Sequence, residues 1–578
     1  MMESIDTTLR ALLRNLAMVF AAYLAFTASL AAQQEQTGQI EPPPLIETVD
    51  VQIINIDAVV TDRRGNPITG LTIDDFELYE NGKLQKITNF YEVNETSIRR
   101  VERAAGQDTP VESIEETKPS ERPPQLQRRF IFFVDNLSLN PFNRNRVFKA
   151  LKEFVDDSME EGDEAMIAAW NRSMKIRVPF TSDREFIKAE LDVLAGESGL
   201  GTHYTSEKKQ VEERIREASS VQQAVLEARS WALSVEHDLR QSVRAINGLL
   251  EQLAGVEGKK AFVMTSEGFY IQPGREMFYF IDETRHQRSD WGQSSGGVML
   301  EGMGFNASHL IRSVAHTANA NDITLYTLHA GGLMGMETAS AANREPVSMT
   351  VQHAALSNST EALQLMAEMT GGLATIGTNN FSAAMKRIDQ DLDSYYSLGY
   401  RSSTQRIDRQ RTIEVRSKNK AHRVRSKRTF VEKSIGTEMT DKVIAKLFFQ
   451  SEENDLGIVL RTEKPTLVED DIFIVPLQIH IPIDNLTLIP QGTARNRGGF
   501  SVWLVAADQQ NDMSDVTTQS HTVNLSDEQL EELRGRHYIY EVELRMRRGR
   551  NMISVGVIDD ISKVKGFRTQ SVLALNLN

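Results

Sequence analysis

The chain has 578 residues, of which 40% are hydrophobic and 25% are charged, close to the averages of globular proteins. This composition argues against a fully disordered, collagen-like or polytopic membrane protein, and the length suits several domains. Asp and Glu outnumber Lys and Arg by 80 to 65, so the net charge of −15 has the wrong sign for a broad nucleic-acid-binding face. The absence of Cys excludes disulfides, thiolate metal sites and Cys nucleophiles.

The N-terminus has the pattern of an export signal. Arginines precede an apolar stretch over 16–30, and small residues follow it up to Ala32. We expect a signal peptide over 1–32, because the stretch is shorter than the ~20 residues that span a bilayer. Cleavage would release a protein without a transmembrane segment into the periplasm or outside the cell. The alternative is an uncleaved signal anchor.

A linker at 33–48 leads to a predicted small β unit at 49–93. Its residues alternate between apolar and polar, and a Gly-Asn-Pro sequence at 65–67 and an Asn-Gly pair at 81–82 are turn signals. About 45 residues are too few for a complete core, so the unit should pack against a neighbour. Residues 94–127 are charged and poor in large apolar residues, which predicts an exposed linker.

Residues 128–433 are expected to form an α/β domain. A buried strand at 129–135, with the sequence RFIFFVD, ends in Asp135 and is followed by alternating helices and strands. This alternation favours a doubly wound, Rossmann-like sheet with a ligand crevice outside the carboxyl ends of its strands. Two helices near 206–253 form a predicted insertion. Further strands are predicted at 165–170, 175–180, 260–265, 323–328 and 372–376, and further helices at 143–157, 184–194, 308–318, 360–370 and 381–395.

Two segments near the C-terminus have their own character. The basic stretch 411–428 could bind an anionic polymer or a lipid surface, but we favour an edge strand whose cations prevent unwanted strand pairing. Residues 434–578 begin with a predicted helix at 441–450 and continue as evenly spaced alternating strands. This pattern predicts an antiparallel β-sandwich.

The order of these pieces resembles a known family. The export signal, the segment VVTDRRGNPITGLTIDDFELYENG, the strand IFFVDNLSLN and the blocks MTGGLATIGTNN and DLDSYYSLGYRS are together similar to the Acidobacterial-type VWFA-related domain proteins. The similarity covers residues 49–432, and GKKAFVMTSEGF resembles the fourth strand of a von Willebrand factor A (VWA) domain. The resemblance implies an exported, Rossmann-like VWA domain flanked by β modules, with a binding or adhesion role and no catalytic chemistry.

VWA domains often hold Mg²⁺ on a DxSxS motif after the first strand, and the resemblance places its first residue at Asp135. The next two motif positions are Leu137 and Leu139, so the pattern is broken. A shift of the loop by one residue would let Ser138 and Asn140 take their place. The alternative is a vestigial crevice in which Asp135 only hydrogen-bonds the following turn.

The resemblance also suggests two more distant ligands. Thr202 or Thr205 lies near the place of the family's Thr, and Glu267 stands where a later Asp is expected. The candidate site would hold Mg²⁺ or Mn²⁺, since these cations prefer oxygen ligands and keep waters. The full candidate ligand set is Asp135, Ser138, Asn140, Thr202 and Glu267.

No catalytic motif accompanies this site. The phosphate loop, the zincin helix and the hydrolase elbow are absent, and the His residues lack ligand spacing. The predicted function is therefore a non-catalytic binding protein that captures a protein or a cell-surface polymer, with or without a divalent cation. One alternative is a structural envelope scaffold that acts through its β modules, and a more remote one is a hydrolase hidden in the helical insertion.

Overall fold

The computed structural model describes residues 53–575, except for 95–96, 103–110, 117–121, 288–295, 334–347, 403–406, 450–452, 470 and 493–494. The predicted signal peptide at 1–32 and linker at 33–48 lie outside the described residues. Within the described part of the chain, no helix is long and apolar enough to cross a bilayer. The mixed α/β class is confirmed, with several sheets and many helices.

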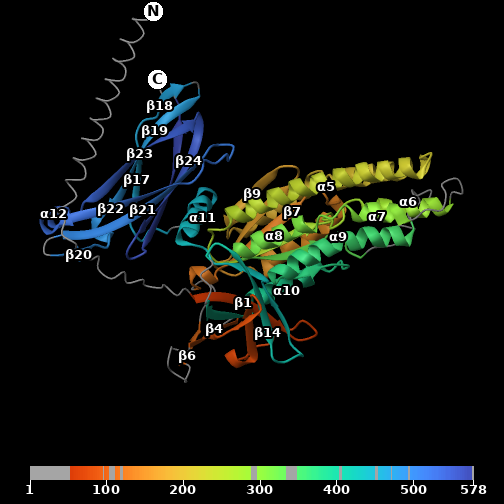
Figure 1. Ribbon diagram of the computed structural model, residues 1–578, viewed down its shortest axis with the longest axis horizontal. Coiled ribbons are helices and arrows are strands. Elements are labelled where there is room, and N and C mark those ends of the chain that lie inside the picture. The colour runs from red at the N-terminus through yellow and green to blue at the C-terminus, as the bar shows by residue number, and fades with distance from the viewer. Residues whose placement is uncertain are drawn as a thin grey trace, which may run out of the picture. The chain divides into compact units, whose positions relative to one another are not determined.

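A six-stranded sheet forms the centre of the α/β domain (Figure 1). Its strand order is β12-β11-β10-β7-β8-β9, and all neighbours are parallel except β8 and β9. Chain order reverses between β7 and β10, and in such sheets ligands bind at this point. The strands are β7 (Arg128–Asp135), β8 (Glu164–Trp170), β9 (Met174–Thr181), β10 (Lys259–Ser266), β11 (Ile323–His329) and β12 (Ala374–Thr375).

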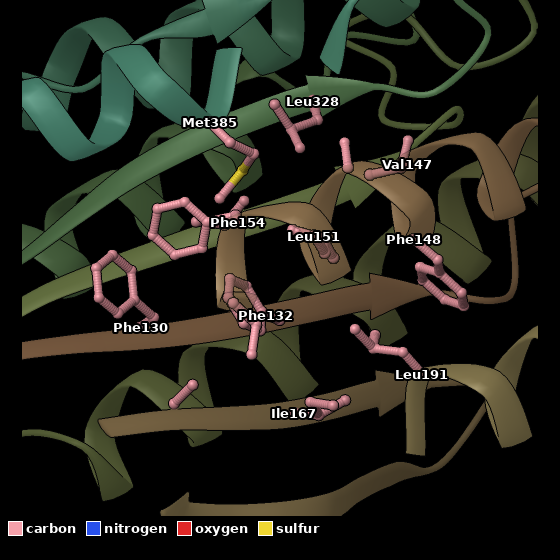
Figure 2. Packing of buried hydrophobic residues seen from close by; sticks show 14 of the residues in the cluster. Phe130, Phe132, Val147, Phe148, Leu151, Phe154, Ile167, Leu191, Leu328 and Met385 are labelled. Carbon is pink, nitrogen blue, oxygen red and sulfur yellow. The ribbon is translucent and has the colours of Figure 1, made fainter. Parts of the chain in front are cut away.

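Helices cover both faces of this sheet. Alternate side chains of β7 point to opposite faces, so Phe130 and Phe132 pack on one core and Ile131 and Phe133 on the other. Figure 2 shows the first core, where Phe154 packs beside them. The first core is covered by α2 (Pro141–Asp157), α3 (Arg184–Gly196) and α10 (Phe381–Asp393). The second core, on the other face of the sheet, is covered by α5 (Val221–Gln252), α8 (Ser308–Ala320) and α9 (Met349–Thr370).

Several elements of the α/β domain differ from the sequence prediction. The helix predicted at 360–370 begins at Met349, and the strand predicted at 372–376 is reduced to Ala374–Thr375. The helix predicted at 381–395 ends at Asp393, because Tyr395 begins a strand of another sheet. The helical insertion has its own core, in which Trp231 of α5 packs with side chains of α4 (Gly201–Glu217), α6 (Arg275–Gln287) and α7 (Gly296–Met303).

The N-terminal β unit is completed by a distant part of the chain. Residues predicted to belong to the α/β domain, from Tyr395 to Val431, pair with strands of the unit and bury Tyr396 against Phe76 and Phe90. The linker predicted at 94–127 contributes β5 and β6 to the same sheet. The unit comprises β1 (Ile53–Thr61), β2 (Phe76–Glu80), β3 (Lys83–Gln85), β4 (Ile87–Asn94), β5 (Ser97–Glu102), β6 (Val111–Glu116), β13 (Tyr395–Arg401), β14 (Gln410–Ser417), β15 (Arg423–Ser426) and β16 (Thr429–Val431).

The basic stretch 411–428 agrees only in part with the predicted edge strand. Its first strand, β14, lies between β16 and β2, whereas its second, β15, which carries Arg423 and Arg425, is at the edge of the six-stranded sheet of the β unit. Several of its cations instead form ion pairs: Arg411 with Glu432, Arg425 with Asp391, Lys427 with Asp322 and Arg428 with Glu368. The charge of the stretch is therefore largely neutralised within the protein, and most of these ion pairs join the β unit to the α/β domain.

The C-terminal region contains two antiparallel sheets that share one core. In β19 buried residues such as Leu477 alternate with half-buried ones, whereas β21 is buried on both faces, with Val502 in this core and Trp503 in a second one. The helix predicted at 441–450 begins earlier, as α11 (Ile435–Phe448), since Ser434 caps it by accepting a hydrogen bond from the Thr437 amide. One sheet holds β17 (Val459–Thr462), β18 (Thr466–Glu469), β19 (Ile472–Pro482) and β23 (His537–Arg547), and the other β20 (Ile489–Gln491), β21 (Arg495–Ala507), β22 (Thr517–Ser526), β24 (Gly549–Asp559) and β25 (Lys565–Ala574), with α12 (Asp527–Glu532) after β22.

Candidate functional site

The ends of the two central strands meet at Asp135. Asp135 is the last residue of β7, and Ser266 is the last residue of the neighbouring β10. The Ser266 hydroxyl donates a hydrogen bond of 2.7 Å to Asp135 Oδ2, and the Ser138 hydroxyl donates one of 2.6 Å to the same oxygen. The two hydroxyls are 3.1 Å apart. The strand ends thus bring three oxygen-bearing side chains together.

The leucines that break the DxSxS pattern also orient the loop. Leu139 is fully buried in the core that contains Phe130 and Phe132, and Leu137 is partly buried against the core on the other face of the sheet. The backbone amides of Ser138 and Leu139 both donate to the Asp135 carbonyl, which closes a tight turn. Ser138 therefore faces Asp135, as a loop shifted by one residue would place it.

The Asp135 carboxylate is buried with only one oxygen satisfied. The residue is 2% exposed, and its Oδ1 has no hydrogen-bond partner among the described residues. Burial raises the pKa of Asp135, while the hydrogen bonds from the Ser138 and Ser266 hydroxyls, and the nearby backbone amides of Ser138 and Leu137, act in the opposite direction. A buried acceptor without a partner is costly, so this oxygen is poised for a donor or a cation.

Glu267 and Asn140 lie beside this group. The Glu267 amide donates to the Ser138 hydroxyl over 3.1 Å, and the Asn140 amide donates to Glu267 Oε1 over 3.4 Å. Burial raises the pKa of Glu267 to about 7. The Asn140 side chain is engaged elsewhere, because its Oδ1 caps α2 by accepting from the Phe142 amide. We define the Asp135 site as Asp135, Ser138, Ser266 and Glu267.

Thr202 is not brought into this group. Its side chain is exposed on the first turn of α4, and in the described structure no hydrogen bond joins it to Asp135 or Ser138. Thr205, the other candidate, donates its hydroxyl to the Gly201 carbonyl. What the start of α4 contributes is the close approach of Gly201, where an added Cβ would lie 2.5 Å from the Ser138 carbonyl oxygen.

Replacing Gly201 with Ala is expected to push the Ser138 turn away from Asp135 and to weaken any cation binding at least tenfold, about 1.4 kcal/mol. The matched control is Gly248→Ala in α5, where an added Cβ meets nothing within 4 Å. That control should stabilise the protein slightly, by up to about 1 kcal/mol, through helix propensity. Calorimetric metal titration and thermal unfolding of both variants check this. Equal behaviour of the two variants would contradict the role of the close approach.

The sequence analysis did not identify Ser266 as part of the site, nor the polar residues Asn143 and Arg146 of α2 next to it. Ser266 follows the predicted strand 260–265, so its place next to Asp135 required the strand order. Asn143 and Arg146 project from the first turns of α2, and Arg146 donates to Asn143 Oδ1 over 2.6 Å. Only the fold shows that these residues border the strand ends. In the described part of the chain, no three His, Asp or Glu side chains cluster as metal ligands.

A cavity of about 690 Å³ lies away from the Asp135 site. It opens beside the amino ends of β10 and β11, at the opposite edge of the sheet, and Lys260 and Asp322 line it. Lys260 donates to the carbonyls of Leu253 and Val256, and Asp322 pairs with Lys427. These charged groups are partnered within the fold, and the cavity is separate from the strand ends that carry Asp135.

No family model matches the chain, and no curated protein matches it. Among solved structures, an aerotolerance-related membrane protein from Bacteroides fragilis is 13% identical over 46% of this chain and 98% of its own, with a TM-score of 0.24. The manganese-loaded TRAP protein of Plasmodium vivax is 10% identical over 53% of this chain and 95% of its own, with a TM-score of 0.20. A mutant PilB minor pilin from Streptococcus sanguinis is 9% identical over 58% and 88%, with a TM-score of 0.25. These similarities are too weak to assign a function.

Proposed function

We propose that this chain is an exported, non-catalytic binding protein of the VWA type, which captures a protein or a surface polymer through a divalent cation held at the Asp135 site. The observation that carries the proposal is the orphaned Asp135 Oδ1, buried beside two hydroxyls at the reversal point of a parallel sheet. The β modules position the domain and add interaction surface.

The oxygen set suits Mg²⁺ or Mn²⁺. Asp135, Ser138 and Ser266 supply one carboxylate and two hydroxyls, and such hard ligands are the ones these cations prefer. When bound, the cation offers open coordination positions to an oxygen of the partner. Glu267 borders the group and adds negative charge when ionised. Asn140 serves the site through its backbone amide and the start of α2, and Thr202 is not part of the proposed ligand set.

A vestigial site in a structural scaffold is the second candidate. Ser266 is 0% exposed and Asp135 nearly so, which favours a closed hydrogen-bonded group that only fixes the Ser138 turn. The two candidates make opposite predictions for metal. A cation from solvent would have to enter past Ser138 and Glu267, because these are the half-buried members of the site.

Calorimetric titration of Mg²⁺ and of Mn²⁺ into the protein tests the proposal. We expect saturable binding with about one cation per chain, because the site has one orphaned carboxylate oxygen. Asp135→Ala should abolish the binding. Heat of binding that survives in Asp135→Ala, or none in the parent at millimolar metal, would contradict the proposal and favour the scaffold.

A further inference from the structure

An amine, a carboxamide and a carboxylate meet beside the amino ends of the central strands. Lys433 lies in the connection between β16 and α11, and its Nζ donates hydrogen bonds of 2.7 Å to Asn321 Oδ1 and 2.6 Å to Asp441 Oδ2. Asn321 lies in the turn between α8 and β11, and Asp441 is in the first half of α11. We call these three residues the Lys433 group.

The Asn321 carboxamide is held in one orientation. The residue is 7% exposed, and its Nδ2 donates to the Leu250 carbonyl over 3.1 Å, so that Oδ1 faces Lys433. Because Cγ is bonded to this oxygen, the amine is kept close to the carbonyl carbon of the amide. Holding two reacting groups together in this way replaces a slow encounter by an intramolecular step.

The helix that carries Asp441 is fixed on the α/β domain. A Cβ added at Gly255, just after α5, would clash with the Asp441 carbonyl oxygen. The next residue, Lys442, pairs with Glu257 over 2.9 Å, and Ala445 is buried in the core of the sheet face that α5 covers. The Asp441 carboxylate is therefore positioned beside Lys433 by contacts on several sides.

The surroundings of the Lys433 group favour proton loss and release of a small molecule. Burial lowers the pKa of the neighbouring Lys260 to about 8, and the charge of Lys433 acts in the same direction. Two ammonium groups so close together disfavour keeping all their protons, and Asp441 is an acceptor within reach. All three members of the Lys433 group line the cavity of about 690 Å³, which gives a leaving group a way out.

We propose that the Lys433 amine condenses with the Asn321 carboxamide to form an isopeptide bond. The bond between Nζ and the Asn321 Cγ forms, and the bond between Cγ and Nδ2 breaks. Two of the three protons of the Lys433 ammonium pass to the leaving nitrogen, with Asp441 as their carrier, so that one ammonium ion departs. The step needs no oxidant and no cofactor.

The bond would give a chain without Cys a covalent cross-link. It joins residues 112 positions apart and ties the start of the C-terminal region directly to the α/β domain. Such a cross-link restricts the unfolded chain as a disulfide does. The inference does not depend on a cation at the Asp135 site. With the proposed function, it adds a covalent path for the load that a captured partner exerts.

Tryptic mapping of the purified full protein by mass spectrometry tests the inference. We expect the peptides that carry Asn321 and Lys433 to be joined in one branched peptide, about 17 Da lighter than the two together, because one ammonia is lost. Mapping is needed because Gln33, which cleavage after Ala32 would make N-terminal, can also lose ammonia by cyclisation. Lys433→Arg keeps a cation beside Asp441 but should give only linear peptides.

Lys427→Arg is the matched control, since Lys427 pairs with Asp322 over 2.5 Å and is not a member of the Lys433 group. It should keep the branched peptide. Asp441→Asn lacks the proton carrier and should contain less than about a tenth of the branched fraction of the parent. Only linear peptides from the parent would overturn the inference and leave the proposed function standing, because the mapping uses no metal. An equal branched fraction in Asp441→Asn would overturn the role given to Asp441.

Discussion

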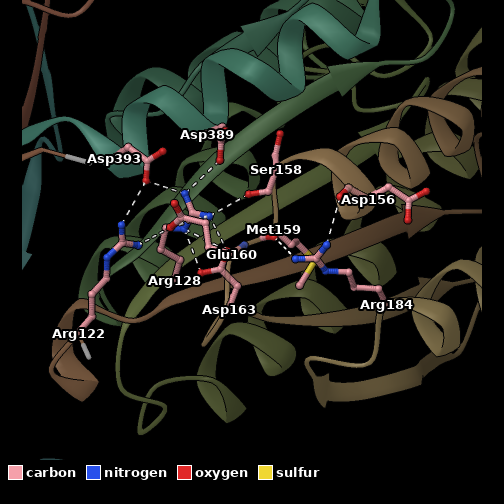
Figure 3. A network of polar contacts seen from close by, with 10 residues as sticks. All are labelled: Arg122, Arg128, Asp156, Ser158, Met159, Glu160, Asp163, Arg184, Asp389 and Asp393. Carbon is pink, nitrogen blue, oxygen red and sulfur yellow. Dashed lines mark hydrogen bonds and ion pairs between the residues drawn. The ribbon is translucent and has the colours of Figure 1, made fainter. Parts of the chain in front are cut away.

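Replacing Arg128 with Met is expected to lower the free energy of unfolding by about 3–5 kcal/mol. Arg128 is 1% exposed at the start of β7 and holds together carboxylates from two parts of the chain (Figure 3). It donates to Asp163 over 3.0 Å and to Asp389 and Asp393 of α10 over 3.1 and 2.6 Å. Met fills a similar volume but leaves these carboxylates without their shared cation in a poorly solvated place.

Urea unfolding followed by circular dichroism measures this effect. The control is Arg416→Ala, because the ion pair of Arg416 with Glu414 is half exposed on both sides. Such surface pairs contribute up to about 1 kcal/mol. If Arg128→Met costs no more than Arg416→Ala, then the buried network does not stabilise the junction of β7 with α10.

Replacing Asp135 with Asn is expected to increase the free energy of unfolding of the metal-free protein by about 1–2 kcal/mol, while abolishing cation binding. The neutral amide has the size of the carboxylate and its oxygen can still accept from Ser138 and Ser266. The substitution removes a buried negative charge, and with it the carboxylate oxygen that has no hydrogen-bond partner. Such a gain in stability is expected when a carboxylate that binds a cation destabilises the metal-free protein.

Asp183→Ala provides the contrasting case. Asp183 caps α3 by accepting a hydrogen bond of 3.0 Å from the Phe186 amide, and its loss should cost about 1 kcal/mol. If Asp135 is only a structural cap, Asp135→Asn should leave stability unchanged and Asp135→Ala should behave like Asp183→Ala. Thermal and urea unfolding of the three variants in the presence of a chelator distinguish these outcomes. A destabilised Asp135→Asn protein would contradict a built cation site.

Local patterns predicted the elements that carry the Asp135 site. The run FIFFVD is apolar at every position before its last residue because both faces of β7 are buried, and this places Asp135 at a strand end. Such a feature depends on neighbours in sequence, and it can be read without the fold. The alternation of Leu137, Ser138 and Leu139 left open whether Ser138 faces the crevice, and only the structure places its hydroxyl beside Asp135.

Other features depend on pairing between distant segments. The alternation of Tyr396, Leu398 and Tyr400 fits a strand, but nothing local shows that its partner is β1, more than 300 residues earlier. Ser266 joins Asp135 only because β10 lies next to β7. The ion pairs of the basic stretch 411–428 could not be predicted, because its acidic partners, such as Asp391 and Asp322, come from other elements.

The most direct test of the central claim is a crystal of the protein soaked with Mn²⁺ and measured at the manganese absorption edge. We predict one strong anomalous peak within about 2.0–2.3 Å of oxygens of Asp135, Ser138 and Ser266, and its disappearance in Asp135→Asn crystals. A fully occupied peak elsewhere, or none at the Asp135 site at a Mn²⁺ concentration that saturates the protein in solution, would contradict it.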